Sequence, residues 1–164
     1  MLKQFIERVS KIKSKPLRKV ARRLSTDFFS INRLCIWGAR RLSGLGDDMK
    51  IAVIGAGAWG TALAVSIGRS SLVSLYGANA ELVGSINQHR ENQRYLPGVS
   101  LSERVQVTDA LELALDGASG IVVAVPTKGL RQSVMRCRSI CGDTIPYLIT
   151  CKGFEVETGL LPFQ

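Results

Sequence analysis

The sequence predicts an α/β fold built on a doubly wound parallel sheet. From residue 49 onward, short apolar runs alternate with segments of helical periodicity, as in strand–helix–strand units with right-handed crossovers. One run, Ile-Val-Val-Ala-Val at 121–125, has no polar alternation, so we expect it to be buried on both faces like a central parallel strand. We expect the sheet to be incomplete and to follow a basic N-terminal extension.

Five strands and four helices are predicted in order. The strands are residues 50–54, 72–76, 104–107, 121–125 and 147–151, and the helices are residues 58–69, 80–88, 109–116 and 128–138. Asp109, with Glu112 three residues later, has the spacing of an N-cap and its reciprocal partner. Thr127, which follows Pro126, is placed to cap the last helix.

The basic charge of the chain is concentrated in residues 1–48. This segment holds twelve Lys or Arg and four Asp or Glu, whereas residues 49–164 hold ten and nine. The domain at 49–164 is therefore nearly neutral, and we expect no nucleic-acid partner for it. For the extension, expected to be disordered or partly helical, three interpretations stay open: a start codon assigned upstream of Met49, a targeting peptide, or a basic arm that contacts nucleic acid or membrane.

Two further classes of protein are disfavoured. Residues 51–68 carry no charge over eighteen residues, which is long enough for a membrane span, but four glycines interrupt the stretch, and we interpret it as a strand, a turn and a helix without membrane insertion. The chain has one histidine, His89, and four cysteines without a Cys-x-x-Cys pair, so we predict no metal site. Cys137 and Cys141, four residues apart, are expected to be small core residues in a reducing cytoplasm.

Residues 55–60, Gly-Ala-Gly-Ala-Trp-Gly, fit the pattern G-x-G-x-x-G at the junction of the first strand and helix. In the Rossmann type of doubly wound fold, this pattern binds a dinucleotide. Gly55 permits the tight turn, Gly57 lets the backbone approach a pyrophosphate, and Gly60 lets helix and strand pack closely. The helix N-terminus offers backbone N–H groups to the phosphates. The alternative is a glycine-rich turn without a ligand.

The end of the second predicted strand bears on the choice between NAD and NADP. NAD sites usually place Asp or Glu there against the ribose, and NADP sites place Arg near the 2′-phosphate. Here the strand is followed by Gly77, Ala78 and Asn79, which carry neither charge, and Glu81 lies too far into the helix. Asn79 can hydrogen-bond a ribose hydroxyl but cannot neutralise a phosphate. The sequence therefore favours NAD(H) over NADP(H).

Four ordered motifs resemble those of the bacterial NAD(P)-dependent glycerol-3-phosphate dehydrogenases. They are Gly-Ala-Gly-Ala-Trp-Gly-Thr-Ala-Leu-Ala at 55–64, the segment 87–98 ending in Tyr-Leu-Pro-Gly, Val-Pro-Thr at 125–127 with Leu130-Arg131, and Cys-Lys-Gly-Phe-Glu at 151–155. The resemblance covers residues 49–164, and Met49 falls where members usually begin. It implies a cytoplasmic, homo-oligomeric enzyme that interconverts dihydroxyacetone phosphate and sn-glycerol 3-phosphate by hydride transfer and feeds phospholipid synthesis. Dehydrogenases of 3-hydroxy acids fit the fold but not the second and fourth motifs.

The resemblance also implies which residues contact the ligands. The cofactor-binding positions it gives are Gly55, Gly57, Ala58, Trp59, Gly60, Ala78, Asn79, Tyr95 and Lys152. Ala58 stands where the family often has Ser, and Ala78 and Asn79 stand where it commonly has a basic pair, which again disfavours NADP. Lys152 would also contact the glycerol phosphate, since a fixed ammonium suits a phosphate or a developing alkoxide.

The resemblance ends before the family's catalytic machinery is complete. The family continues into further strands and a helical C-terminal domain that supplies a general-base lysine, whereas this sequence stops at Gln164. Hydride transfer at C2 needs a proton donor or acceptor at the C2 oxygen, and Lys128 and His89, the candidates by residue type, lie outside the family's catalytic motifs. We therefore expect the chain alone to be inactive. The alternative is a non-catalytic NAD(H)-binding module or a pseudogene fragment.

Overall fold

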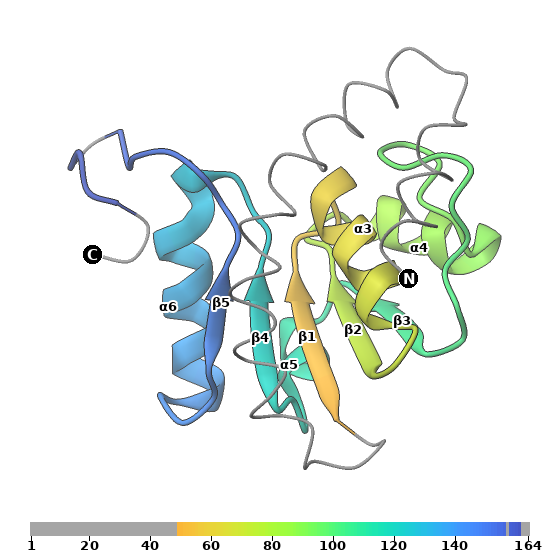
Figure 1. The fold of residues 1–164 in the computed structure, drawn as a ribbon, viewed down its shortest axis with the longest axis horizontal. Coiled ribbons are helices and arrows are strands. Elements are labelled where there is room, and N and C mark those ends of the chain that lie inside the picture. Colours follow the sequence, from red (N-terminus) through yellow and green to blue (C-terminus); the bar gives the residue numbers. More distant parts are fainter. Residues whose placement is uncertain (1–48, 157, 162–164) are drawn as a thin grey trace. The chain divides into compact units, whose positions relative to one another are not determined.

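The computed structural model of the chain describes residues 49–156 and 158–161. They contain a five-stranded sheet of order β3-β2-β1-β4-β5, in which every neighbouring pair is parallel (Figure 1). The strands are β1 (Lys50–Ile54), β2 (Leu72–Tyr76), β3 (Val105–Thr108), β4 (Gly120–Val123) and β5 (Tyr147–Ile149). The predicted α/β fold of Rossmann type is confirmed. The predictions for residues 1–48 lie outside the described residues.

Helices connect the strands and cover both faces of the sheet. They are α3 (Ala58–Ile67), α4 (Ala80–His89), α5 (Leu111–Leu115) and α6 (Leu130–Cys141), with a 3-10 helix η1 (Thr127–Gly129) before α6. Apolar residues of α3 and α4 form one core cluster with the sheet, and those of α5 and α6 form a second cluster. The uncharged stretch at 51–68 is β1, a turn and α3, as predicted. Within the described part of the chain, no helix has the length and apolar character that a bilayer crossing requires.

Strand β4 lies between β1 and β5 and contributes to both clusters. Ile121 and Val123 face the cluster that contains α5 and α6, whereas Val122 faces the cluster that contains α3 and α4. All three side chains are at most 5% exposed, which confirms burial on both faces for residues 121–123 of the predicted run; Ala124 and Val125 are only partly buried. Since the strand order reverses between β1 and β4, their carboxyl ends form the switch point at which doubly wound sheets bind ligands.

Several element boundaries differ from the prediction because backbone pairing decides them. Strand β4 ends at Val123, although the Ala124 N–H still donates to the Ile54 carbonyl at 2.8 Å. Pro126 follows two residues after Ala124, and it has no backbone N–H with which to continue the pairing. Strand β5 ends at Ile149, two residues early, and β3 is shifted forward by one residue relative to 104–107.

Both predicted helix caps are wrong. Helix α5 begins after Ala110, not after Asp109, because the Thr108 hydroxyl accepts the Ala110 N–H at 3.1 Å in a local turn that delays the helix. The hydroxyl of Thr127 does not cap a helix either. It donates to the Lys152 carbonyl at 2.7 Å, and Pro126 occupies the cap position of η1.

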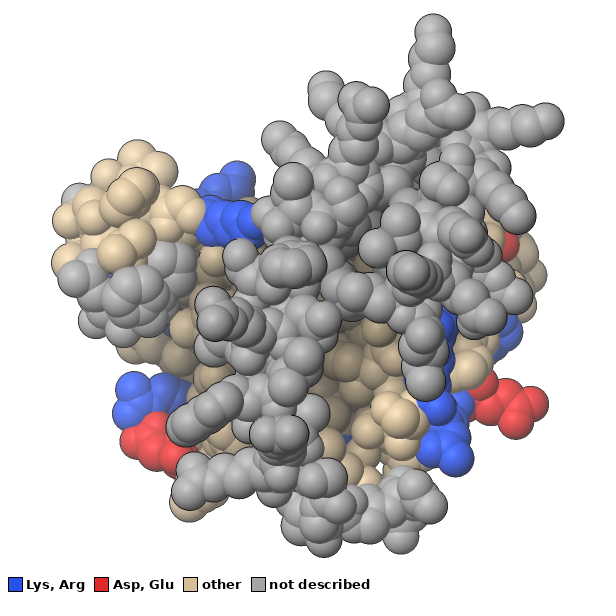
Figure 2. Space-filling model, in the orientation of Figure 1, with Lys and Arg blue, Asp and Glu red and all other residues tan. Residues whose placement is uncertain are grey.

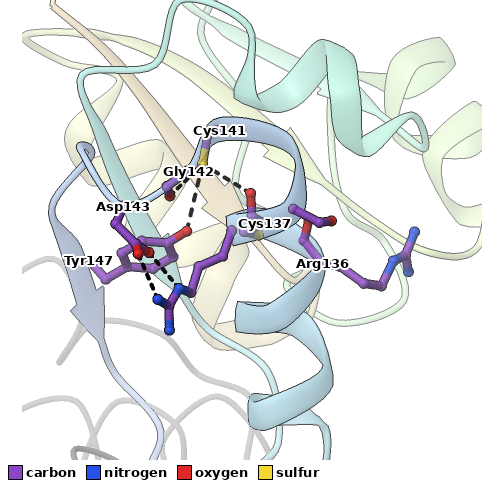
Figure 3. Close-up of polar contacts among 8 residues, drawn as sticks. Arg136, Cys137, Cys141, Gly142, Asp143 and Tyr147 are labelled. Carbon is purple, nitrogen blue, oxygen red and sulfur yellow. Dashed lines mark hydrogen bonds and ion pairs between the residues drawn. The ribbon is translucent and has the colours of Figure 1, made fainter.

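The C-terminal end of α6 contacts β5 through Cys141, whose Sγ lies 3.6 Å from the Tyr147 hydroxyl (Figure 3). Cys137 is fully buried in the core, as predicted, and Cys141 donates its thiol to the Cys137 carbonyl at 3.0 Å. Burial, with a smaller contribution from Cys141, raises the pKa of the Cys137 thiol to about 11, and Arg136 opposes the rise. Cys137 is therefore a neutral packing group at physiological pH.

Charges of the described residues are mixed rather than segregated on the face that Figure 2 draws. On the face drawn in Figure 2, the Lys and Arg side chains of the described residues lie in separate places, some of them beside Asp or Glu side chains. One such pair joins Arg138 to Asp143 at 2.5 Å near the end of α6. This distribution agrees with the near-neutral composition of residues 49–164.

Gly84, in the middle of α4, supplies a test of the helix assignment. A Cβ built there meets nothing within 4 Å, so Gly84→Ala should raise the free energy of unfolding by about 1 kcal/mol through helix propensity. Urea denaturation with an unchanged slope measures this gain. As the contrast, Gly68→Ala should destabilise, since its Cβ would lie 2.5 Å from Val105 Cγ2; stabilisation by both changes would contradict the packing described here.

Candidate functional site

The turn between β1 and α3 can be made only by glycine at its first position. Gly55 has φ +116°, a conformation that side chains other than glycine rarely adopt. Its N–H donates to the Tyr76 carbonyl at 2.9 Å, and an added Cβ would lie 2.6 Å from the Ala124 carbonyl oxygen. The turn therefore packs closely against the carboxyl ends of β2 and β4.

The other two glycines of the motif have opposite surroundings. A Cβ at Gly60 would lie 1.8 Å from the Gly55 carbonyl oxygen, so helix and turn are in direct backbone contact there. No atom of the described residues would lie within 4 Å of a Cβ at Gly57. Gly57 therefore borders open space, at the point where α3 begins.

The N-terminus of α3 is suited to an anion. Gly57 is the N-cap and has no side chain to accept the first N–H groups, and no acidic residue lies in the first turn. These N–H groups have no partner within the helix, and the helix dipole adds partial positive charge at this end. Open space beside uncapped donors is the arrangement that holds a phosphate at a helix N-terminus.

Asn92 is hydrogen-bonded to the glycine turn and to α3, although the sequence did not single it out as a site residue. Its Nδ2 donates to the Ala56 carbonyl at 3.0 Å and to Thr61 Oγ1 at 2.8 Å, and its Oδ1 accepts the Tyr95 N–H at 3.1 Å. Asn92 and Thr61 are both fully buried. The only signal in the sequence was the position of Asn92 within the motif at 87–98, since the partners that connect it to the glycine turn, Ala56 and Thr61, lie more than thirty residues away.

The second strand–helix turn lies against the first. A Cβ at Gly77 would lie 2.9 Å from Ala56 Cβ, so glycine is needed for this approach. Ala78 and Asn79 follow and are exposed. Asn79 caps α4, with its Oδ1 accepting the Leu82 N–H at 2.7 Å. The carboxamide Nδ2 carries two further donors on the same side chain.

Tyr95 is connected to the glycine turn through Asn92. Its backbone N–H donates to Asn92 Oδ1, while its ring is 42% exposed. The guanidinium carbon of Arg94 lies 5.3 Å from the ring centroid, within the range of a cation–π contact. The exposed ring therefore lies on a loop that is connected to the glycine turn through the buried side chain of Asn92.

Lys152 lies on the loop that follows β5, at the carboxyl edge of the sheet (Figure 1). Its carbonyl accepts the Thr127 hydroxyl, and Thr127 comes three residues after Ala124, which contacts Gly55 and Gly60. Farther along the loop, Glu155 forms a two-bonded ion pair with Arg131 of α6, at 2.8 and 2.6 Å. The third and fourth sequence motifs are therefore joined by direct contacts.

Because of the ion pair with Arg131, we expect the Glu155 carboxyl to titrate at an unusually low pH. The Arg131 guanidinium, followed by the Thr158 hydroxyl, lowers the pKa of Glu155 from its ordinary 4.5 to about 2. A lowered folded-state pKa stabilises the loop above pH 4.5, and this stabilisation is lost as the pH falls toward 2. Carboxyl NMR of the chain should show the low midpoint, and Arg131→Ala should return it toward 4.5. A midpoint near 4.5 in the unchanged chain would contradict the pair.

The structure brings most of the predicted site residues to one edge of the sheet. Gly55, Gly57, Ala58, Trp59 and Gly60 form the first turn and the start of α3, and the other predicted positions lie on the loops described above. His89 lies apart, in the last turn of α4, with Nδ1 2.9 Å from the Ser85 carbonyl. Lys128 is an exposed residue of η1. Among the described residues, no group of three or more His, Cys, Asp or Glu side chains could hold a metal ion.

Comparisons with known proteins agree on one family. Residues 50–164 match the family model described as NAD-dependent glycerol-3-phosphate dehydrogenase N-terminus. Proteins named glycerol-3-phosphate dehydrogenase (NAD(P)+) from Dechloromonas aromatica and Neisseria gonorrhoeae are 41% and 43% identical over 116 and 117 residues, or 71% of this chain. The solved glycerol-3-phosphate dehydrogenase of Coxiella burnetii superposes with a TM-score of 0.65 at 26% identity, covering 68% of this chain and 35% of that one. The chain spans 35% and 36% of the two curated relatives.

Proposed function

The chain belongs to the family of NAD-dependent glycerol-3-phosphate dehydrogenases, and from this premise we propose that residues 49–164 bind NAD(H) for the interconversion of dihydroxyacetone phosphate and sn-glycerol 3-phosphate. The observation that carries the proposal is the open space at Gly57 beside the uncapped N-terminus of α3. A bound NAD supplies the hydride acceptor for the hydrogen on C2 of glycerol 3-phosphate.

The turn would bind the pyrophosphate through its backbone. Gly55 and Gly60 fix the path of the chain, and Gly57 keeps the approach open. The N–H groups of Ala58, Trp59 and Gly60 stand at the start of α3, where a helix binds an anion most strongly. No charged side chain is required for this interaction, which agrees with the near-neutral composition of the domain.

We assign the adenosine ribose to the turn after β2. Asn79 uses its Oδ1 for the cap of α4, so its Nδ2 is the group that would donate to a ribose hydroxyl. Neither Ala78 nor Asn79 can balance a 2′-phosphate, which supports a preference for NAD(H) over NADP(H). Tyr95 would border the cofactor with its exposed ring.

Lys152 would contact both the cofactor and the substrate phosphate. Its position on the loop after β5, at the carboxyl edge of the sheet, supports this role, and an ammonium there would attract the phosphate of either substrate. The proposal also places the enzyme in the cytoplasm and, as the family resemblance implies, in a homo-oligomer.

Calorimetric titration of the full chain with NADH and with NADPH tests the proposal. We expect saturable binding of NADH and weaker binding of NADPH. Asn79→Arg should reduce the difference in affinity between NADH and NADPH, because the arginine supplies a partner for the 2′-phosphate. A sample that is folded by circular dichroism and binds neither nucleotide at millimolar concentration would overturn the proposal.

A further inference from the structure

We propose that Thr127 and the Arg131–Glu155 ion pair are positioning residues, which fix the loop after β5 so that Lys152 reaches the bound cofactor and substrate phosphate. The inference rests on the proposed function, because it assigns a role to residues that act through Lys152. None of these three residues was assigned a ligand contact by the sequence. Their contacts with one another and with the loop carry the argument.

The first anchor lies at Lys152 itself. The Thr127 hydroxyl donates to the Lys152 carbonyl at 2.7 Å, and Thr127 begins η1 directly after the Val125-Pro126 segment that passes the glycine turn. The side chain of Val125 would be 3.2 Å from a Cβ at Gly55. The hydrogen bond therefore ties the backbone of Lys152 to the segment that packs on the proposed pyrophosphate turn.

The second anchor lies three residues later. Glu155 accepts two hydrogen bonds from the Arg131 guanidinium, at 2.8 Å from Nε and 2.6 Å from Nη2, and one from the Thr158 hydroxyl at 2.5 Å. The backbone of Glu155 also pairs with Leu160 and Gly159, at 2.9 and 2.8 Å. A planar, two-bonded pair fixes orientation as well as distance. The Lys152 segment is thus held at both ends by η1 and α6.

Cys151 packs against the core cluster of α5 and α6, but apolar packing does little to hold the loop after it, so the polar anchors decide the conformation of residues 152–156. Phe154 is 63% exposed and Val156 is 92% exposed. Gly153, between the anchors, has φ +106° and approaches Thr127 Oγ1 closely enough that an added Cβ would lie 3.8 Å from it. When buried apolar contacts are few, loss of an anchor frees the local backbone. The expected consequence is a displaced Lys152 ammonium.

A double-mutant cycle on the full chain separates positioning from general stability. Arg131→Ala and Lys152→Ala should each weaken NADH binding about tenfold, as expected for loss of a charged contact. The double variant should bind no more weakly than Lys152→Ala alone, because Arg131 acts through Lys152. The loss of melting temperature caused by Arg131→Ala should be the same in both backgrounds. A purely structural pair would not produce this coupling in affinity.

Control variants show whether the loss of NADH affinity is specific to these positioning residues. Arg138→Ala breaks the other ion pair of α6, with Asp143, and should leave NADH affinity unchanged. The exchange R131E with E155R should recover affinity, and Thr127→Ser should bind as the unchanged chain does while Thr127→Val should not. Unchanged affinity in Arg131→Ala, or losses that add in the double variant, would overturn the inference alone. Failure of the unchanged chain to bind NADH would overturn the proposed function and the inference together.

Discussion

Gly60→Ala is expected to unfold the domain. The added methyl carbon would lie 1.8 Å from the Gly55 carbonyl oxygen and 3.0 Å from its carbon, and both are backbone atoms that no rotamer change can move. Relief requires α3 or the end of β1 to shift within a packed core, at a cost we place above about 4 kcal/mol. That is a large part of the stability of an ordinary domain. Urea denaturation and the yield of folded chain measure the loss.

Gly57→Ala is the matched control, with the same chemical change three residues earlier. Its φ of −77° and ψ of −176° suit alanine, and its Cβ meets no atom within 4 Å. Stability should fall by no more than about 1 kcal/mol, the cost of alanine at an N-cap. NADH affinity should nevertheless fall about 100-fold, because the methyl occupies the space through which a pyrophosphate approaches the backbone.

The predictions for Gly60→Ala and Gly57→Ala can be contradicted independently of each other. A Gly60→Ala chain as stable as the unchanged chain would contradict the contact between α3 and the turn. A Gly57→Ala chain that keeps its NADH affinity would show that no pyrophosphate approaches this part of the backbone. Together they separate what the motif does for the fold from what it does for the ligand.

The fold was predictable because its signals are local. Most strands are short, largely apolar runs, β3 alternates apolar and polar residues, and the turn at 55–60 lies between β1 and α3 in unbroken sequence. The ends of β4 and β5 were not predictable to the residue, since one further backbone N–H after each strand still bonds to the neighbouring strand: Ala124 donates to the Ile54 carbonyl and Thr150 to the Val123 carbonyl. The Asp109 cap failed for a related reason: the neighbouring Thr108 hydroxyl took the Ala110 N–H.

The candidate site was predictable only where its residues are contiguous. The glycine turn could be identified from spacing, and Lys152 from the motif that contains it, although their roles stay predictions. Asn92 could not be found, because its partners Ala56 and Thr61 lie 36 and 31 residues away. The Arg131–Glu155 pair, 24 residues apart, was equally hidden. Such contacts depend on how strands and helices meet, which periodicity does not specify.

Asn92→Asp is expected to destabilise the domain by about 3–5 kcal/mol, because it breaks a fully satisfied buried amide. One carboxylate oxygen would replace Nδ2 and face the Ala56 carbonyl, which has no proton to donate. The Thr61 hydroxyl can turn to donate to it, and the Tyr95 N–H still donates to the other oxygen, but these two neutral donors do not compensate a buried negative charge that faces the Ala56 carbonyl. Since Ala56 belongs to the glycine turn, NADH affinity should fall as well.

The pH dependence of stability in the Asn92→Asp variant shows whether a buried carboxylate causes the loss of stability. Burial raises the pKa of a carboxyl, so the new carboxyl group would hold a proton in the folded variant that the unfolded chain has released. The stability of the variant should therefore be greater at about pH 5 than at about pH 8, a difference the unchanged chain lacks at this position. Asn87→Asp is the control, since Asn87 makes one bond, from Nδ2 to the Val107 carbonyl at 3.1 Å, from an exposed position. Equal urea midpoints for the two variants at both pH values would mean that Asn92 does not hold the turn, and the link between Tyr95 and the proposed pyrophosphate site would be lost with it.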